Sequence, residues 1–433
     1  MPDKTKEIKE PKKGNSTSCL YDETKYGYHE NKTITLDELE PIIKSQLEKV
    51  HYATGTIGVK LRIFKRLNKL ARKLNTPYYT EELRRAFLED GKYYKNTTVF
   101  CKSRYELHRR LIHYIDSYFT TGQVDFTACP LTIQYTNEHE DLQTAYQIFQ
   151  SNITNLKSNT REGYSRIVSY FLEYLSNDKG YSKLSEIKKG DVSAFFPKVV
   201  NEHYHTGLPS VASGLRLFLS IEEFQLPTSF LAEVPTRIAK PQKIINPLSD
   251  EELDRVNTTL DSAKEHGISL RDKAVCEIAN GTGYRSVDIT GITFSNINWD
   301  KNILTIIQQK TGKVLTYPLS ASMGNAIVDY LLYERPESES EYIFLSQIAP
   351  HAPLISHAGI RDIIKKILEC AEISRNENIG TRLTRHSRAT YLLRRGIPLS
   401  HISASLGHCG LNTVNRYLSA DEAKLIECIL PLP

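Results

Sequence analysis

The spacing of apolar residues predicts that the chain is built mostly from amphipathic helices. In residues 59–74 (VKLRIFKRLNKLARKL) apolar side chains recur every three or four positions, and Arg and Lys fill the positions between them. The apolar set is Leu61, Phe64, Leu67, Leu70, Ala71 and Leu74. The basic set is Arg62, Lys65, Arg66, Lys69, Arg72 and Lys73. Because this spacing matches the turn of an α-helix, the segment is predicted to be a helix with one buried face and one strongly basic exposed face.

Changes in composition predict where this first helical region begins and ends. Residues 1–32 are polar and nearly lack aliphatic side chains, which predicts a flexible tail. Helical periodicity returns near residues 81–88 and 103–118. The segment 121–132 (TGQVDFTACPLT) lacks this periodicity and is interpreted as a linker. Residues 33–125 are therefore predicted to form an N-terminal helical domain.

A second helical block follows the linker. Its most regular part is NTREGYSRIVSYFLEYLSNDKG (159–180), in which one helix face is apolar. That face comprises Tyr164, Ile167, Val168, Phe171 and Leu175. Residues 133–232 are predicted to form this second helical domain.

A proline-rich connector separates the second block from the rest of the chain. It contains Pro235, Pro241 and Pro247, which interrupt helix and favour extended backbone. Ser249 and Glu252 then have the spacing of a capping box, so a new domain is predicted over residues 248–433. Within it, residues 302–319 (NILTIIQQKTGKVLTYPL) are β-branched runs around a Lys-Thr-Gly-Lys turn, which predicts a β-hairpin. The predicted fold is mainly α, with a small β element that makes the last domain α+β.

Charge is distributed unevenly along the chain. The net charge of the 433 residues is +5, yet residues 51–110 hold fifteen Lys and Arg against five Asp and Glu. The rest of the chain is therefore net acidic. A basic block with interleaved aromatic residues favours contact with a phosphate backbone. A solvated helix face accounts for the composition equally well.

Composition also excludes several classes of protein. There is no run of about 18 apolar residues, so no membrane span is predicted. The N-terminus lacks the apolar stretch of a secretory signal. The seven cysteines are scattered singly with no CxxC pair, which favours a reducing cytosol over a disulfide framework or a zinc site. There is no phosphate-binding GxxxxGK[ST] loop and no Asp/Glu pair at metal-ligand spacing, so neither a cofactor nor a metal is expected.

Four short patches in the last domain carry candidate chemistry. They are GTGYRSVDITGI with Arg285 and Asp288, the hairpin residue Lys310, TRLTRHSRATYLL with Arg382, Arg385 and His386, and LGHCGLNTVNRYL with His408 and Tyr417. Each patch alone has an ordinary explanation. A tyrosine near a helix end usually packs, a lysine in a hairpin turn is usually solvated, and an arginine after Gly-Tyr can be a surface charge.

The order and spacing of the patches resemble the tyrosine recombinase (phage integrase) family. That family has an Arg after a Thr-Gly-aromatic start, a Lys on a β-hairpin, a His-x-x-Arg, a Leu-Gly-His and a Tyr nine residues beyond that His. The chain is similar at each step, including the interval of nine between His408 and Tyr417. The resemblance is strong over residues 248–420 and looser over 138–230, which is similar to the family's helical core-binding domain. Residues 1–130 carry no motif of the family.

The resemblance implies a role for each member of the set. Tyr417 would attack the DNA backbone and form a covalent 3′-phosphotyrosine, while Arg285 and Arg385 would clamp the non-bridging oxygens. Lys310 would protonate the departing 5′-oxygen, and His408 would contact phosphate or help to deprotonate Tyr417. The supporting and DNA-binding residues would be Asp288 and His386 behind the site, Arg161 and Arg166 in the core-binding domain, and the six basic residues of 59–74. Asp288 would orient Arg285, and an ordinary surface i,i+3 ion pair explains it equally well.

The chain departs from the family pattern at two positions. Arg382 stands where the family usually has His. A guanidinium can still donate to phosphate oxygens, but it does not exchange a proton near neutral pH, so any acid–base role falls to Lys310 or His408. Arg388 stands where an apolar residue is more usual, and an added phosphate contact is the one role that the sequence suggests for it.

The resemblance also implies function and partners. The favoured hypothesis is an integrase or transposase of a mobile element, a site-specific recombinase that clamps double-stranded DNA in a C shape and acts as a DNA-bound tetramer in the cytoplasm, at the nucleoid. Accessory DNA-bending or transposon-encoded proteins are further candidate partners. The tail 418–433 is expected to dock on a neighbouring protomer, with docking on its own domain as the alternative. A type IB topoisomerase and a catalytically inactive DNA-binding regulator are the alternative functions.

Overall fold

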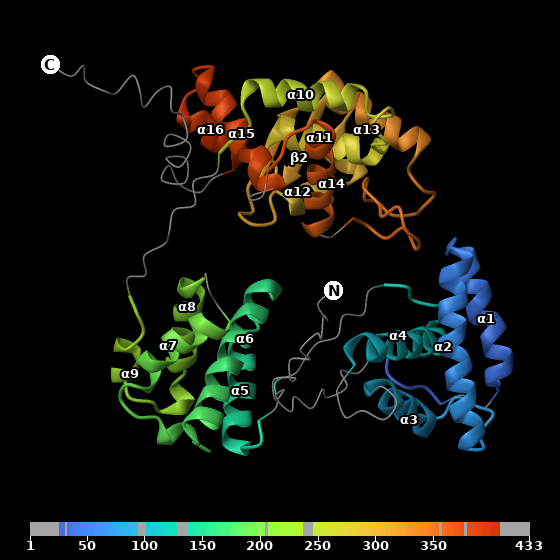
Figure 1. The fold of residues 1–433 in the computed structure, drawn as a ribbon, viewed down its shortest axis with the longest axis vertical. Helices are drawn as coiled ribbons and strands as arrows, with labels where there is room; N and C mark the ends of the chain where they lie inside the picture. Colours follow the sequence, from blue (N-terminus) through green and yellow to red (C-terminus); the bar gives the residue numbers. More distant parts are fainter. Residues whose placement is uncertain are drawn as a thin grey trace, which may run out of the picture. The chain divides into compact units, whose positions relative to one another are not determined.

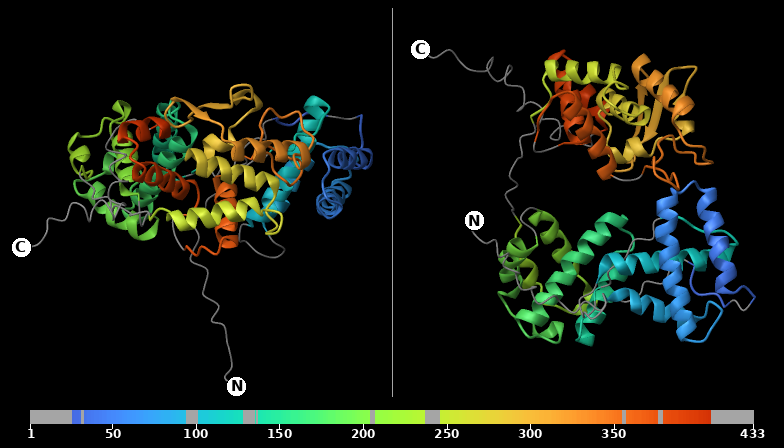
Figure 2. Two further views of the ribbon diagram at one scale, coloured as in Figure 1. Left: turned by 90° about the horizontal axis from the view of Figure 1, so that it is seen from above. Right: turned by 45° about the vertical axis from the view of Figure 1, so that its right-hand side comes forward.

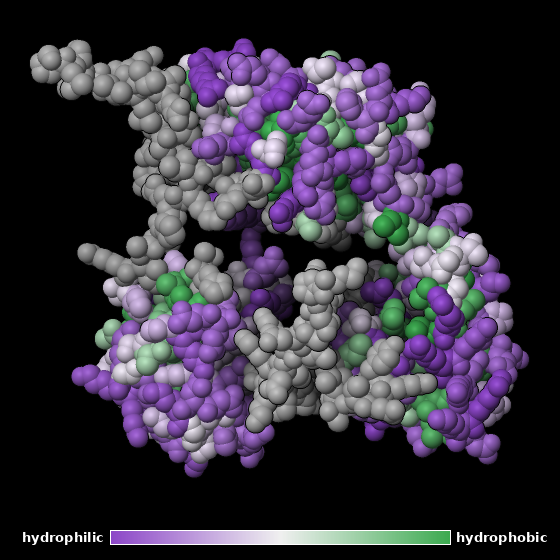
Figure 3. All heavy atoms as spheres, viewed as in Figure 1, coloured by the Kyte–Doolittle hydropathy of each residue, from purple (hydrophilic) through white to green (hydrophobic). Residues whose placement is uncertain are grey.

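The computed structural model describes residues 26–30, 33–93, 101–127, 135, 137–203, 207–236, 246–354, 357–375 and 379–407. Their regular secondary structure is helical, apart from one small antiparallel sheet (Figures 1 and 2). The predicted class, mainly α with a β-hairpin in the last domain, is confirmed. No helix among the described residues is long and apolar enough to cross a membrane. The face drawn in Figure 3 is predominantly hydrophilic.

The first helical section contains four helices, of which α1 and α2 lie side by side in Figures 1 and 2. They are α1 (Leu36–Lys49), α2 (Thr54–Lys73), α3 (Glu81–Lys92) and α4 (Lys102–Thr121). A capping box of Thr35 with Glu38 begins α1. On α2, Phe64, Leu67 and Ala71 are buried, as predicted from their spacing. All six basic residues of the predicted exposed face are exposed.

A buried polar network holds α3 and α4 together. The Asp116 carboxylate is fully buried and accepts hydrogen bonds from the Tyr79 hydroxyl (2.7 Å) and from Nε and Nη2 of Arg84 (3.2 and 3.1 Å). Because a buried charge is tolerated only where it is paired and hydrogen-bonded, this network fixes the register between the two helices.

Segments before and after the four helices pack against them. The Tyr26 hydroxyl donates to Asp125 (2.6 Å), and its ring lies 5.5 Å from that of His113. Phe126 packs edge-on against Tyr114. Tyr26 belongs to the segment interpreted as a flexible tail, and Asp125 and Phe126 to the segment interpreted as a linker. Their contacts are aromatic and polar, which is why apolar periodicity did not indicate them.

Lys60 is partly buried inside this section, on the side of α2 opposite the basic face. Its Nζ donates to the Tyr114 hydroxyl (2.7 Å) and lies 4.9 Å and 4.7 Å from the ring centroids of Tyr52 and Tyr114. Burial lowers the pKa of Lys60 to about 8, and the positive charge of Arg110 adds to the shift. Cation–π attraction to two tyrosines therefore offsets only part of the desolvation of the ammonium.

The second helical section is built around aromatic side chains. It comprises α5 (Glu140–Asn152), α6 (Ser158–Glu173), which continues into the π-turn η1 (Tyr174–Asp178), α7 (Asp191–Glu202), α8 (Leu208–Leu219) and α9 (Ser229–Ala232), with 3₁₀ turns η2 (Leu184–Glu186) and η3 (Glu222–Phe224). Phe171 packs edge-on against Phe195 and Phe218, and Phe218 against Phe149. All four rings are buried. The predicted apolar face of α6 therefore lies in this core.

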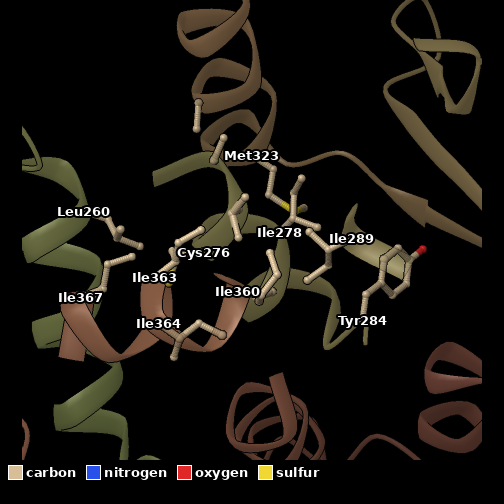
Figure 4. Close-up of a cluster of buried hydrophobic side chains, with 14 of the residues drawn as sticks. Leu260, Cys276, Ile278, Tyr284, Ile289, Met323, Ile360, Ile363, Ile364 and Ile367 are labelled. Atoms are coloured by element: carbon tan, nitrogen blue, oxygen red, sulfur yellow. The ribbon is translucent and has the colours of Figure 1, made fainter. Parts of the chain in front are cut away.

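The third section surrounds the buried helix α11. Its helices are α10 (Asp250–Asp261), α11 (Leu270–Thr282), α12 (Ser286–Thr290), α13 (Ala321–Tyr333), α14 (His357–Cys370), α15 (Thr381–Arg394) and α16 (Leu399–Leu406), with a 3₁₀ turn η4 (Phe294–Asn296). Helix α11 contacts α12, α13, α14 and α15. Figure 4 shows isoleucines of α14 facing Cys276 and Ile278 of α11, with the Tyr284 hydroxyl directed away from them. Ser249 and Glu252 form the predicted capping box of α10.

The sheet of this section contains three antiparallel strands in the order β1 (Ile297–Asn298), β2 (Ile303–Ile307) and β3 (Val314–Pro318). Strands β2 and β3 pair from Ile303 with Pro318 to Ile307 with Val314. This is the predicted hairpin, and Lys310 lies in the turn between the strands.

The turn after α11 is closely packed against two later helices. Gly283 has a φ of 66° and ends α11. A Cβ added there would lie 2.9 Å from Cδ2 of Leu406 and 3.4 Å from Cα of Arg385. Glycine is therefore needed for the backbone conformation and for the close approach of α15 and α16.

This packing predicts different costs for two glycine substitutions. Gly312 has a similar φ of 69° but open space around it. We expect Gly312→Ala to cost about 1 kcal/mol, the backbone penalty alone. Gly283→Ala should cost about 1–3 kcal/mol more, because overpacking adds to that penalty. Urea unfolding of the full chain measures both, and equal costs would contradict the close approach at Gly283.

The lowered pKa of Lys60 predicts that the stability difference between the wild type and a variant without this lysine depends on pH. In the unfolded chain the pKa of Lys60 returns to about 10.4. Between about pH 8 and pH 10 the unfolded chain therefore binds more protons than the folded chain. The stability of the wild type relative to Lys60→Met should therefore rise with pH across this window, whereas below it the penalty for burying the charge is fully present. Parallel urea unfolding of both proteins measures the difference, and a difference independent of pH would be the contrary result.

Candidate active site

Arg285 lies on a short, rigid turn between α11 and α12. The Thr282 hydroxyl donates to the carbonyl of Ile278 (2.6 Å) and accepts from the backbone N–H of Tyr284 (3.1 Å). After Tyr284 the chain re-enters helix, with Arg285 as the N-cap of α12. The next N–H, that of Ser286, donates to the Thr381 hydroxyl at the start of α15 (3.2 Å). The backbone of Arg285 is thus held from both sides.

The side chain of Arg285 is paired with a buried carboxylate. Its Nη1 lies 4.0 Å from Oδ2 of Asp288, whose side chain is fully buried. The other oxygen of Asp288 accepts the backbone N–H of Gln309 in the hairpin turn (3.1 Å). The interpretation of Asp288 as a surface ion pair is wrong, because this carboxylate joins the Arg285 turn to the hairpin inside the protein.

Burial raises the pKa of Asp288. The Gln309 N–H and the positive charges of Arg285 and Arg385 act in the opposite direction and do not outweigh the loss of hydration. Oδ2 of Asp288 and Nη1 of Arg285 are both buried and lack a hydrogen-bond partner in the structure. The Arg285 side chain as a whole is 23% exposed, so an anionic oxygen can approach its accessible part.

Arg385 connects three elements of the site. It lies on α15 and is 6% exposed. Its Nη1 donates to the carbonyl of Gly283 (3.0 Å), and its Nη2 donates to the carbonyl of Leu406 at the end of α16. The guanidinium thereby fixes the turn that precedes Arg285 against the end of α16.

The other candidate residues of α15 differ in exposure. Arg382, in the position usually held by His, is exposed, and His386 is half-buried. Arg388 donates from Nε (3.2 Å) and Nη2 (2.7 Å) to the Tyr317 hydroxyl on β3, and its guanidinium also lies over the ring of Tyr391. Arg388 thus joins α15 to the hairpin, and the phosphate contact suggested for it stays a prediction.

Lys310 is exposed at the tip of the hairpin, and the turn beneath it is well ordered by hydrogen bonds. The N–H of Gln308 donates to Lys313 (2.9 Å), and the N–H of Gly312 donates to Gln308 (2.8 Å). The buried Gln308 side chain donates to the carbonyl of Leu406 (3.1 Å) and accepts from the Thr311 hydroxyl (2.8 Å).

Hydrogen bonds thus join four of the sequence patches around one point. The base of the Lys310 hairpin and α15 both bond the Leu406 carbonyl, α15 also bonds the Gly283 carbonyl in the Arg285 turn, and Asp288 bonds the hairpin. His408 and Tyr417 follow directly in sequence but lie outside the described residues. The predicted DNA-binding residues of the second section are on α6, where Arg161 is half-buried and Arg166 exposed.

Two contributors were missed from the sequence. Tyr317 was not assigned a role, and no pattern of apolar residues indicates its contact with Arg388. Gln308 could have been found, because the inward alternation of Leu304 and Ile306 continues to position 308. A polar side chain at an inward position needs a partner, which marks it as a residue with a specific role.

Comparison with known proteins agrees with this geometry. Residues 247–424 match the family model described as the phage integrase family, close to the predicted range of 248–420. A Sinorhizobium fredii protein named as integrase/recombinase y4rF is 32% identical over 166 residues, which are 38% of this chain and 39% of that protein. Tyrosine recombinase XerA of Pyrococcus furiosus is 26% identical over 63% of this chain and 87% of its own length. The chain thus spans well under half of the first of these relatives.

A solved structure has the same fold. The site-specific recombinase XerH, crystallised with a palindromic difH substrate, aligns with 80% of this chain and 93% of its own length, with a TM-score of 0.52 and 19% identity. Residues 247–424 therefore carry a phage integrase family domain, and the chain is similar in sequence to tyrosine recombinases.

Proposed function

We propose that this protein is a site-specific DNA recombinase that cuts and rejoins DNA through a covalent bond between Tyr417 and the 3′-phosphate. The observation that carries the proposal is the Arg285 side chain, which is 23% exposed and lies within a hydrogen-bonded frame shared with Arg385 and the Lys310 hairpin. A phosphodiester oxygen is the acceptor that a planar guanidinium matches best.

Each step of the reaction has a candidate group. The Tyr417 oxygen attacks phosphorus, and the bond from phosphorus to the 5′-oxygen breaks as Lys310 supplies the proton that the leaving alkoxide needs. Arg285 stabilises the charge that grows on the non-bridging oxygens. Rejoining is the reverse attack by a 5′-hydroxyl. Because the phosphotyrosine conserves the energy of the original ester, rejoining needs no ATP.

Arg385 and Arg382 have different proposed roles, one inside the site and one at its surface. Arg385 is buried and donates to two carbonyls, so its first effect is to position the Arg285 turn, and its charge adds to the positive potential at the site. The exposed Arg382 is suited to a phosphate contact from the surface of α15. As it holds its proton, proton transfer is assigned to Lys310 and His408.

The biological setting follows from the type of reaction. Exchange between two duplexes requires paired cuts, so we expect a tetramer on DNA, with the tail 418–433 docked on a neighbouring protomer. These residues lie outside the described part of the chain. An integrase or transposase of a mobile element, acting on cytoplasmic DNA at the nucleoid, accounts best for an additional basic helical section ahead of the core-binding helices.

The direct test is trapping of a covalent intermediate. Nicked suicide duplexes cut from the DNA that flanks the coding region should form a denaturant-resistant adduct with the wild-type protein. Tyr417→Phe should abolish the adduct, because it lacks the attacking oxygen, and retain binding. The same adduct with Tyr417→Phe would refute the assignment. Binding without cleavage would indicate a regulator, and relaxation of any supercoiled plasmid would indicate a topoisomerase.

The basic face of α2 predicts a salt-dependent contribution to DNA binding. Lys65, Lys69 and Arg72 are exposed along one side of the helix. Replacing any one by Gln should reduce the slope of log K against log salt by about 0.9 if it neutralises one phosphate. The control is Lys44→Gln on α1, whose charge is paired with Glu48 (3.6 Å). Binding of a mixed-sequence duplex measures the slopes, and equal slopes for the α2 variants and the control would exclude this surface.

A further inference from the structure

Gln308 is the fully buried polar residue at the base of the Lys310 hairpin. It follows the last residue of β2 and lies on the same face as the buried Leu304 and Ile306. An apolar side chain would fill this inward position at no cost in hydration. A glutamine there must compensate for the desolvation of both ends of its amide.

Both ends of the Gln308 amide are hydrogen-bonded. Nε2 donates to the carbonyl of Leu406 (3.1 Å), and Oε1 accepts from the Thr311 hydroxyl (2.8 Å). Leu406 lies 98 residues away in sequence, whereas Thr311 is the immediate neighbour of Lys310. One side chain therefore connects the turn that carries Lys310 to the end of α16.

The contact with α16 is closely fitted. Gly407 has a φ of 65°, and a Cβ added to it would lie 2.3 Å from Oε1 and 2.7 Å from Cδ of Gln308. The backbone of α16 therefore approaches the amide as closely as glycine permits. A close contact with a hydrogen bond at each end of the amide has little freedom to shift.

Lys310 itself is exposed, so its position depends on the turn that carries it. The Lys310 turn is held in two places: Asp288 accepts the N–H of Gln309, and the Gln308 side chain bonds Thr311 and Leu406. The first contact relates the turn to Arg285. The second relates it to the segment that leads directly to His408.

We infer that Gln308 is a positioning residue that sets Lys310 against the departing 5′-oxygen and couples that placement to the Leu406–Gly407 segment. The inference rests on the proposed recombinase function, in which Lys310 supplies the proton as the bond from phosphorus to the 5′-oxygen breaks. Gln308 does not touch DNA in this role. It reduces the number of positions that the turn can adopt, which is how a general acid gains its effect.

The chemistry of the leaving group separates this role from a structural one. If sulfur replaces the 5′-bridging oxygen, the group leaves as a thiolate, and a thiol has a pKa of only about 8.5. Departure then needs no proton from Lys310. A defect that arises solely from misplacement of Lys310 should therefore disappear on the sulfur substrate, whereas a defect in folding, binding or attack by Tyr417 should remain.

The experiment compares cleavage of nicked suicide duplexes with oxygen or sulfur at the 5′-bridging position. Gln308→Met keeps the length of the side chain and removes both hydrogen bonds. It should cleave the oxygen substrate about 10- to 100-fold more slowly than the wild type, within the range that general acids contribute. On the sulfur substrate its rate should match that of the wild type. Thr311→Val removes one of the two bonds and should show the same selective defect to a smaller extent.

The control is Gln347→Met, the same change at an exposed glutamine of the third section, which should leave both rates unchanged. Equal slowing of Gln308→Met on both substrates would overturn the inference, as would wild-type rates on both. Failure of the wild type to form any adduct would instead refute the proposed function. The two failures are therefore distinguishable.

Discussion

The carbonyl of Leu406 is the point on which the arrangement of the site depends. A carbonyl oxygen has two lone pairs, and here it accepts from the Arg385 guanidinium and from the Gln308 amide. Helix α15 and the β-hairpin are thereby hydrogen-bonded to the same oxygen atom at the end of α16. Arg385 also bonds Gly283, which places the Arg285 turn in the same frame. Movement of α16 would consequently displace Arg285 and Lys310, the proposed clamp and the proposed general acid, together.

Burial of charge is the cost of this frame. Asp288 and Arg385 are both almost excluded from water, and the raised pKa of Asp288 shows that its surroundings do not fully compensate for lost hydration. Burying such a pair is often no better for stability than apolar packing. The buried carboxylate instead fixes positions, because one oxygen of Asp288 faces Arg285 and the other accepts a hydrogen bond from the hairpin.

Local sequence patterns predicted much of the fold, but they could not predict contacts between residues far apart in the sequence. The apolar faces of α2 and α6 follow from the helical period of 3.6 residues. The hairpin and the Ser249 capping box follow from short local motifs, which likewise act within one element or turn. The ordered set from Arg285 to Tyr417 was identified from its resemblance to the tyrosine recombinase family. The junction of Gln308 with Leu406 could not be derived, since 98 residues separate them and no periodicity relates them. The contact of Arg388 with Tyr317 could not be derived for the same reason, because Tyr317 lies on a different element.

Exposed and buried charges are used differently in this chain. The basic residues of α2 are in water, where salt screens them over about 8–10 Å at moderate ionic strength. They can attract and orient DNA, but the interaction weakens with salt. Arg385 and Asp288 are shielded from mobile ions, so the field around Arg285 changes little with salt. Ionic strength should therefore act mainly on how often DNA is bound, and the buried frame should govern how fast bound DNA is cut. Because these two properties reside in different sections of the chain, substitutions on α2 can alter affinity without disturbing the hydrogen bonds to Leu406.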